Sequence, residues 1–254
     1  MIASEKDKEI LKEGGRRLAR VLEEVAKDIR PGVSIATLND KADALIREGG
    51  DTPAFLGYTA FGAGRPYPAS LCVSVNDVVV HGIPTEHNLV LQQGDIVGID
   101  CGLVHRGLIV DSARTIPVGE IDAKTKKLME VTREALYVGI EASRVGNTVG
   151  DIGHAIEEYV RTFGYGIVRE LCGHGVGKKL HEEPQVPNFG KAGEGAELKE
   201  NMVIAIEPML NLGSEDVIFD DDGYTVRTRD GSTSAHFEHT IIITKDGPEI
   251  LTKL

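Results

Sequence analysis

Two stretches of this 254-residue chain have weakly similar counterparts later in the sequence, in the same order. Residues 30–38 (RPGVSIATL) are similar to residues 144–152 (RVGNTVGDI), at an offset of 114 residues. Residues 91–100 (LQQGDIVGID) are similar to residues 198–207 (LKENMVIAIE), at an offset of 107 residues. Internal similarity at nearly constant spacing indicates a duplicated structural unit. We therefore predict two similar halves that share one centre.

Hydrophobic spacing assigns related elements to the two halves, which we place at about residues 1–118 and 119–254 of a single domain. In each half, apolar residues at helical spacing predict two helices, and β-rich runs follow them. The predicted helices cover residues 4–29, the first opening with a capping box of Ser4 and Asp7, then 34–49, 123–142 and 149–163. The strands of the first half cover 71–75, 78–80, 96–103 and 108–116. The predicted fold class is therefore α/β in the broad sense (α+β).

The charge balance and the cysteines exclude several classes of protein. The chain has 28 basic and 40 acidic residues, a net charge of −12, and no run of Lys and Arg that would follow a nucleic-acid backbone. It has no apolar stretch of the roughly 18 to 20 residues that a membrane-spanning helix needs, and its first residues do not resemble a secretory signal. The three cysteines show no CxxC spacing, so neither a disulfide framework nor a thiolate zinc site is predicted. We expect a cytoplasmic protein that binds neither nucleic acid nor membrane.

Asp100 and Asp111 lie in two apolar β-type runs that a short turn connects. A hairpin turn centred on His105 and Arg106 would place the two acids directly opposite one another, with Cβ atoms about 5 Å apart. Two carboxylates in an apolar setting repel, unless one keeps its proton or a cation lies between them. The alternative is that both side chains alternate outward into water.

Glu207 and Glu238 also stand beside apolar β-type runs. The run at residues 202–206 is continuously apolar, which is typical of a strand that is buried on both faces. An acid at the end of such a strand is predicted to face a cavity, a partner or a metal, because an unpaired buried charge is very costly. The alternative for each glutamate is an exposed position at the end of a strand.

His174 is framed by glycines in the loop-like segment CGHGVG, residues 172–177. A dinucleotide-binding loop is one interpretation, but the spacing is GxGxG rather than GxGxxG and no amphipathic helix follows. The other interpretation is that the glycines let the backbone pack closely, so that the imidazole points into a pocket. One histidine and the four acids would make an oxygen-rich ligand set, which suits two cations about 3.5–4 Å apart better than a mononuclear zinc site.

Several short motifs, in this order along the chain, resemble those of the type I methionine aminopeptidases. They are VHGIP (80–84), ID (99–100), VD (110–111), CGHGVG (172–177), HEEP (181–184), IEPM (206–209) and FEHT (237–240). The resemblance covers essentially the whole chain, and only 32 residues separate His174 from Glu207, too few for the large insert of the type II enzymes. It implies a pseudo-twofold "pita-bread" fold with a central antiparallel sheet and helices packed outside.

The resemblance also implies a ligand set for two divalent metal ions, which could be cobalt, manganese, iron or zinc. Asp111 and Glu238 would bridge the two ions. Asp100 would chelate one of them, while His174 and Glu207 would complete the other. The implied reaction is removal of the initiator methionine from nascent polypeptides by attack of an activated water on the first peptide bond.

Three catalytic residues follow from the same resemblance. Glu207 would carry a proton towards the leaving amine, and His81 and His181 would contact the substrate and polarise the scissile carbonyl. The alternative for His81 is a role in capping the turn before Gly82. We expect the remaining histidines to be surface or structural groups; they are His87, His105, His154, His236 and His239.

Recognition of methionine needs an apolar, partly aromatic pocket. Tyr67 and Cys72 match a family segment that contributes walls to this pocket. The chain departs from many relatives at Leu180, where they carry a bulky aromatic residue, and at Tyr224, where Trp is common. Residues 59–66 (TAFGAGRP) also form a longer segment than in short bacterial relatives. We therefore expect the metal chemistry to be kept and the shape of the pocket to differ.

Two other functions are open at this stage. One is a peptidase of the same fold that acts on Xaa-Pro bonds, although the IEPM context of Glu207 fits the methionine enzymes better. The other is a metal-free protein of this fold that binds partners without catalysis; such proteins lose metal ligands, whereas this chain keeps all five. The resemblance further implies a monomer that works close to the ribosome.

Overall fold

The computed structural model describes residues 1–60 and 62–254. The helices are α1 (Glu5–Ala26), α2 (Ile35–Glu48), α3 (Ala123–Ala142) and α4 (Val149–Arg161). The strands up to α3 are β1 (Thr52–Pro53), β2 (Cys72–Val75), β3 (Val78–Val80), β4 (Ile96–His105) and β5 (Leu108–Pro117). The later strands are β6 (Gly166–Ile167), β7 (Gly173–Gly175), β8 (Glu182–Val186), β9 (Val203–Ile206), β10 (Met209–Asn211), β11 (Val217–Phe219), β12 (Val226–Thr228), β13 (Ser234–His236), β14 (His239–Thr244) and β15 (Gly247–Ile250).

All four predicted helices are present, and side-chain caps define where three of them begin. Ser4 and Asp7 form a capping box at the start of α1, as predicted, and Thr148 begins α4 in the same way with Asp151. The side chain of Asp122 accepts two backbone N–H bonds at the start of α3. None of the helices in the described ranges combines the length and apolar character needed to cross a bilayer.

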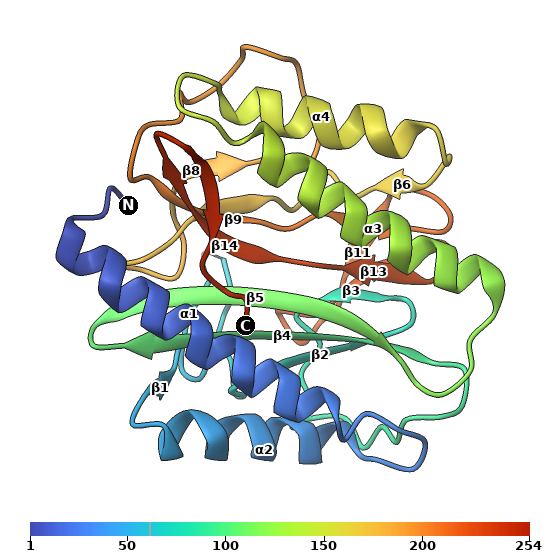
Figure 1. The fold of residues 1–254 in the computed structure, drawn as a ribbon. Helices are drawn as coiled ribbons and strands as arrows, with labels where there is room; N and C mark the ends of the chain where they lie inside the picture. Colours follow the sequence, from blue (N-terminus) through green and yellow to red (C-terminus); the bar gives the residue numbers. More distant parts are fainter. Residues whose placement is uncertain (61) are drawn as a thin grey trace.

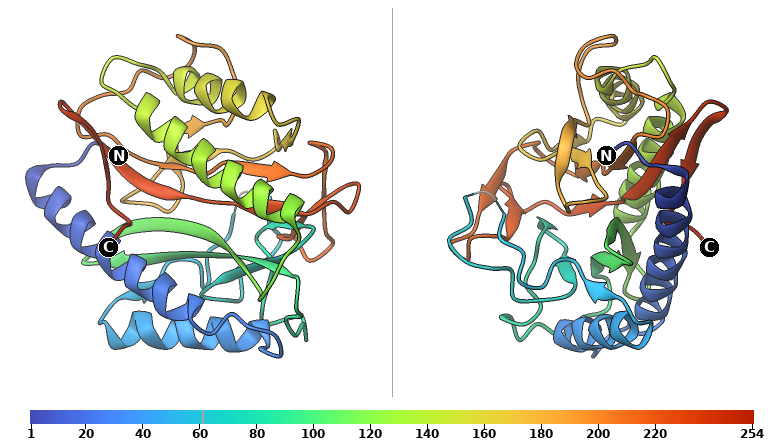
Figure 2. Two further views of the ribbon diagram at one scale, coloured as in Figure 1. Left: turned by 45° about the vertical axis from the view of Figure 1, so that its right-hand side comes forward. Right: turned by 90° about the vertical axis from the view of Figure 1, so that its left-hand side faces the viewer.

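Helices α1 and α3 cover one side of the strands, while α2 lies along the lower edge and α4 along the upper edge of the view in Figure 1 (Figures 1 and 2). Helix α1 packs across β4 and β5, and α3 packs against β9, β10 and β13. The two longest antiparallel arrangements are the sheet β1-β4-β2, to which β5 is added through β4, and the five-stranded sheet β15-β14-β9-β7-β8. In the right-hand view of Figure 2, the long connections between strands lie on the side opposite α1 and α3. The predicted fold class is therefore confirmed: antiparallel sheets lie inside and helices outside.

Several backbone hydrogen bonds recur at positions related by the two sequence offsets. In both halves, the chain entering the second helix pairs with the segment that leads into a central strand. The equivalent N–H donors and carbonyl acceptors are Gly32 to Leu91 and Gly146 to Leu198, Ile35 to Leu89 and Val149 to Ala196, and Leu91 to Val33 and Leu198 to Asn147. The donors and acceptors are related by the offsets of 114 and 107 residues found in the sequence. The similar sequence segments therefore make the same backbone hydrogen bonds, which supports the prediction of two related halves.

The hairpin of β4 and β5 has a different register from the predicted one. Asp111 pairs with Gly102 rather than with Asp100. The turn residues are Arg106 and Gly107, with φ of 50° and 85°, and a two-residue turn with positive φ at both positions favours glycine at the second. The prediction of directly opposed acids is therefore wrong. Because the error is two residues, Asp100 and Asp111 still share one face, as diagonal neighbours.

The two halves meet where β5 runs beside the start of β14. Ala113 and Glu238 exchange backbone hydrogen bonds, and the Ser112 hydroxyl donates to the Glu238 carbonyl at 2.8 Å. The Thr240 hydroxyl accepts from the Asp111 N–H at 2.9 Å and donates to the Asp111 carbonyl at 2.7 Å. These contacts hold an acid from each half at the same seam.

Candidate active site

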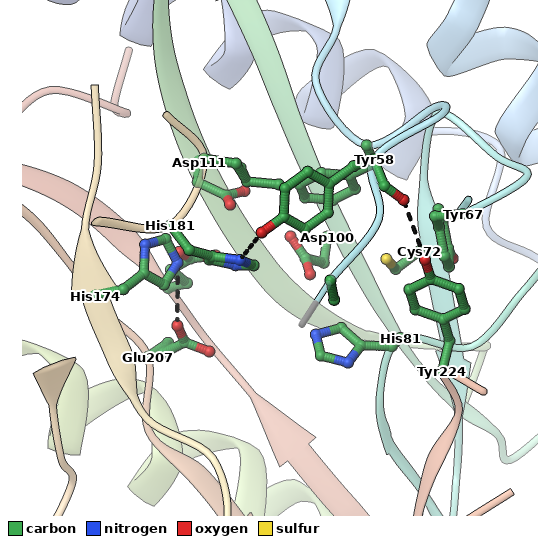
Figure 3. A pocket seen from close by; sticks show the side chains of 14 residues that line it. Tyr58, Tyr67, Cys72, His81, Asp100, Asp111, His174, His181, Glu207 and Tyr224 are labelled. Carbon is green, nitrogen blue, oxygen red and sulfur yellow. Dashed lines mark hydrogen bonds and ion pairs between the residues drawn. The ribbon is translucent and has the colours of Figure 1, made fainter. Parts of the chain in front are cut away.

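One pocket is lined by every residue that the sequence assigned to the site (Figure 3). Three further residues, Phe55, Tyr58 and Ala60, complete its wall. The predicted residues among the lining are Tyr67, Cys72, His81, Asp100, Asp111, His174, Leu180, His181, Glu207, Tyr224 and Glu238. Residues from both halves and from many separate elements therefore converge on one place.

Side-chain alternation brings Asp100 and Asp111 into the pocket. On β4, Ile99 and Cys101 belong to the core beneath α1, so Asp100 between them points to the opposite face. On β5, Val110 belongs to the same core and its neighbour Asp111 faces the pocket. Both aspartates are buried, with exposed fractions of 9% and 3%, so the alternative that they point outward into water is wrong.

Glu207 and Glu238 reach the pocket from adjacent strand ends. Glu207 follows β9 directly and Glu238 precedes β14, and the pairing of Ile206 with His239 brings these ends together. Glu238 is 2% exposed, and the side chain of Glu207 is 13% exposed. The prediction that these acids face a cavity rather than open solvent is confirmed.

His174 lies on the short strand β7 rather than in a loop, and its glycine neighbours are required by close packing. A Cβ on Gly173 would lie 2.3 Å from the carbonyl oxygen of Ala205. A Cβ on Gly175 would lie 2.3 Å from the carbonyl oxygen of Glu183. The glycines therefore let neighbouring strands approach β7, which supports the packing interpretation over a dinucleotide-binding loop.

We expect Gly175→Ala to lower the free energy of unfolding by about 2–3 kcal/mol, because backbone atoms have to move to make room for the methyl group. The same movement should displace His174 and weaken metal binding. Chemical denaturation and metal titration would measure both effects. Gly64→Ala is the matched control and should be nearly neutral, since among the described residues no heavy atom beyond its chain neighbours lies within 4 Å of its ideal Cβ. Equal stabilities of the two variants would contradict the packing argument.

Three residues form a tight group of potential metal ligands. Asp111, His174 and Glu238 each present one ligand atom, and these atoms lie within 4.8 Å of one another. Asp100 and Glu207 line the same pocket outside this tight group. An imidazole and carboxylates are suitable ligands for Mn, Fe, Co or Zn. The five residues together span more space than the ligands of one ion would need, which suits a pair of ions.

The pocket contains four buried acids, and the positive charge needed to balance their ionised forms is not supplied by neighbouring side chains among the described residues. Burial raises the pKa of Asp111 to about 7. The pKa values of Asp100, Glu207 and Glu238 are raised well above their usual range, by burial first and then by the neighbouring carboxylates. Buried carboxylates without a counter-ion keep their protons, whereas a bound cation favours the ionised form.

Unpaired oxygen atoms support the same conclusion. Asp100 Oδ1, Asp111 Oδ1 and Glu238 Oε1 are buried and have no hydrogen-bond partner among the described residues. Buried polar atoms are nearly always paired, and an exception points to a missing ion or water. The residues present therefore fit a divalent cation, because each of these unpaired oxygens belongs to a predicted metal ligand.

Two further histidines of the pocket are held as neutral imidazoles. Burial lowers the pKa of His81 to about 4 and also lowers that of His181. The rings of His181 and His174 meet edge to face with centroids 4.4 Å apart. His81 directly follows β3 and has a positive φ of 60°, a conformation that non-glycine residues rarely adopt and that often marks functional sites.

An apolar end adjoins the acidic part of the pocket. Tyr67, Cys72, Leu180 and Tyr224 belong to one buried cluster, together with Phe55. The Tyr67 and Tyr224 rings meet edge to face at 5.0 Å, and the Tyr67 hydroxyl donates to the Gly82 carbonyl at 2.9 Å. The hydroxyl groups are thus turned to backbone partners, which leaves ring faces and edges for an apolar ligand.

Sequence reasoning missed four neighbours of the site, one of which, Ala60, lies within the longer stretch 59–66. Phe55 and Tyr58 lie in the segment before the longer stretch 59–66, of which residue 61 is outside the described residues. His236, which we expected to be a surface or structural group, is buried with its Nε2 atom 3.7 Å from Glu207 Oε2. Its position two residues before Glu238 is the one sequence feature that could have revealed it.

Comparison with known proteins agrees with this geometry. The profile of metallopeptidase family M24 matches residues 9–245. A methionine aminopeptidase of Clostridium acetobutylicum is 43% identical over 252 residues, which cover 99% of this chain and 98% of that protein. The crystal structure of methionine aminopeptidase from Thermotoga maritima superposes with a TM-score of 0.95 at 42% identity, and the match covers 100% of this chain and 99% of that one.

Peptidases with other substrates share the fold at lower similarity. An Xaa-Pro dipeptidase of Bacillus anthracis superposes with a TM-score of 0.79 at 25% identity, and the match covers 100% of this chain but 62% of that one. Identity, coverage and structural agreement are all higher for the methionine aminopeptidases. The chain belongs to metallopeptidase family M24 and, within it, to the methionine aminopeptidases.

Proposed function

We propose that this protein removes the N-terminal methionine from newly made polypeptides by hydrolysis of the first peptide bond. The observation that carries the proposal is the juxtaposition of four buried acids and His174 with the apolar end of the same pocket. The acids suit cation-assisted hydrolysis, and the apolar end suits a methionine side chain. The similarity to methionine aminopeptidases over nearly the whole chain supports both parts.

We assign five residues to the metals. Asp111 and Glu238 would serve as ligands common to two divalent ions, Asp100 would complete the ligand set of one, and His174 and Glu207 would complete that of the other. When bound, the ions supply a water-derived nucleophile at neutral pH. The proposal is supported by the unpaired buried oxygens of Asp100, Asp111 and Glu238. The identity of the metal depends on availability, because cobalt, manganese, iron and zinc all accept these ligands.

The remaining polar groups act on the substrate. Glu207 is placed to take a proton from the attacking water and to pass it to the leaving amine. Its carboxylate lies between two imidazoles, with Oε1 3.5 Å from His174 Nε2 and Oε2 3.7 Å from His236 Nε2. His81 and His181 donate hydrogen bonds to the carbonyl oxygen as negative charge develops on it.

The side chain of the leaving methionine occupies the apolar end. Tyr67, Cys72, Leu180 and Tyr224 surround it, and a flexible thioether makes favourable contacts with aromatic edges. The leucine and the tyrosine stand where many relatives carry larger aromatic residues, so the pocket should tolerate a broader range of unbranched apolar side chains. We place the reaction in the cytoplasm, with the enzyme acting as a monomer on chains that emerge from the ribosome.

Three peptides test the substrate. Protein freed of metal and then supplied separately with Mn, Fe, Co or Zn should hydrolyse Met-Ala-Ser fastest with at least one ion. Met-Leu-Ser should react more slowly, because a bulky second residue crowds the scissile bond. Ala-Pro should not be hydrolysed. Release of free methionine or alanine measures each rate. Preference for Ala-Pro would replace the proposal by an Xaa-Pro peptidase, and inactivity with every metal would favour a protein that binds without catalysis.

A further inference from the structure

Tyr58 contacts His181 inside the pocket and has no part in the mechanism described so far. The phenol oxygen of Tyr58 lies 2.8 Å from Nδ1 of His181, as the dashed line in Figure 3 shows. The two rings meet edge to face, with centroids 5.2 Å apart and an interplanar angle of 75°. A contact this short and well oriented fixes an imidazole that has no other hydrogen-bonded side chain among the described residues.

The direction of this hydrogen bond determines which nitrogen of His181 carries the proton. A neutral imidazole has one N–H group, so one nitrogen donates and the other accepts. Burial raises the pKa of the Tyr58 phenol, which therefore keeps its proton at neutral pH and can donate it to Nδ1. The N–H group then lies on Nε2, the nitrogen that remains available to a substrate.

Hydrogen bonds fix the backbone of Tyr58 and also the far end of the segment that follows it. The Tyr58 carbonyl accepts hydrogen bonds from the Tyr67 N–H at 2.7 Å and from the Tyr224 hydroxyl at 3.0 Å. The Tyr224 hydroxyl also lies 2.6 Å from the carbonyl oxygen of Arg65. Arg65 makes two hydrogen bonds to Glu86, at 2.6 and 2.7 Å. Both ends of the longer segment are therefore anchored, and Tyr58 is presented to His181 from a fixed backbone.

We propose that Tyr58 is a positioning residue for His181, which it holds in one orientation and in the tautomer with the proton on Nε2. From there, the imidazole donates to the carbonyl oxygen of the scissile bond. No proton is transferred to or from Tyr58, because the phenol acts only as a hydrogen-bond donor. The inference rests on the proposed function, in which His181 is the donor to that oxygen.

The test is Tyr58→Phe, which removes one oxygen atom and keeps the ring. With Met-Ala-Ser as substrate, kcat should fall about 10- to 100-fold, by analogy with the loss of an outer hydrogen-bond partner of a metal-ligating histidine. KM should stay within about threefold, because the aromatic wall is kept. In a His181→Ala background, Tyr58→Phe should cause no further loss, since two residues that act through one another are not additive. Tyr159→Phe on α4 is the matched control and should leave kcat unchanged.

A second measurement does not depend on turnover. Nitrogen-15 NMR of the histidine rings in the metal-free protein should show an unprotonated Nδ1 and a protonated Nε2 for His181, and a mixture of tautomers in Tyr58→Phe. Three results would overturn the inference: a protonated Nδ1 in the wild type, an equal loss of kcat in both backgrounds, or a rise in KM with kcat unchanged. If the wild type does not hydrolyse Met-Ala-Ser, the proposed function fails, while the spectra still decide the role of Tyr58.

Discussion

Asp111→Asn should lower kcat for Met-Ala-Ser by at least about a thousandfold while the protein remains folded. Loss of a single uncharged hydrogen-bond donor in an active site reduces kcat by roughly 10²–10³, and loss of a charged ligand shared by two cations should exceed this. Asparagine has nearly the same shape as aspartate, so the packing of β5 is preserved. Glu238→Gln should have the same effect, because both acids are assigned the same bridging role.

Measurements of metal content, circular dichroism and turnover on the same preparations would check this prediction. Both variants should bind less metal than the wild type and keep its far-ultraviolet spectrum. Asp122→Asn is the matched control: the same chemical change is made at the start of α3, where asparagine caps a helix as well as aspartate does. Near-normal turnover in Asp111→Asn would refute the assignment of the metal ligands.

The metal-free protein should become less stable as the pH rises from 6.5 to 8. In this window the folded protein keeps protons on buried acids, such as Asp111 with its pKa of about 7, that the unfolded chain has already released near the ordinary aspartate pKa of 3.8. The folded state therefore binds more protons, and stability falls with pH by at most about 1.4 kcal/mol per pH unit for each such group, an effect that fades for Asp111 once the pH passes its folded pKa. The pKa values of Asp100, Glu207 and Glu238 shift in the same direction.

The histidines of the site act in the opposite direction, but only at lower pH. Burial lowers the pKa of His174 to about 3 and that of His81 to about 4, from the ordinary histidine pKa of 6.5. Their contribution to stability is therefore complete above pH 6.5 and is lost as the pH falls below it. The unfolded histidines are half protonated at pH 6.5 and nearly all neutral by about pH 7.5, so the acids dominate the slope in the upper part of the window.

Thermal unfolding of chelator-treated protein, followed at several pH values, would measure this trend. Addition of Mn²⁺ should raise the melting temperature most at pH 8, where the acids ionise readily to bind it. Metal-free Glu238→Gln lacks one of the buried acids, so its melting temperature should exceed that of the wild type at pH 8 and change less with pH. A melting temperature of the metal-free wild type that rises between pH 6.5 and 8 would contradict the uncompensated burial of these carboxylates.

The sequence predicted most of the fold because local preferences and tertiary contacts agree. The capping box of Ser4 and Asp7 marks the start of α1, and the range predicted for α3 is the observed one. The exception is the hairpin of β4 and β5. Its register depends on the positive φ at Arg106, a non-glycine residue whose sequence context does not indicate this conformation. The face shared by the two acids was predicted nevertheless, because a shift of two residues preserves it.

The site residues that belong to short sequence motifs could be predicted from the sequence. The acids and His174 stand in recognisable segments, and all of them line one pocket. Tyr58 and His236 were missed for different reasons. The contact of Tyr58 with His181 joins residues 123 positions apart, and no local pattern encodes such a distance. His236 ends β13, two residues before Glu238, and this closeness in sequence to a predicted ligand is the feature that could have identified it.

The repeated hydrogen bonds at the entry to α2 and α4 are accompanied by acids at equivalent positions of the two similar segments. Asp100 and Glu207 occupy equivalent places in the two repeats, at the ends of the similar segments 91–100 and 198–207. On a twofold axis between two identical subunits, every group contributed by one copy is met by the same group from the other. A half-length chain with a single carboxylate at this place would thus have formed a symmetric acid pair simply by dimerising. Joining the two subunits of such a dimer into one chain would leave acids at equivalent positions, as Asp100 and Glu207 are in the two similar segments.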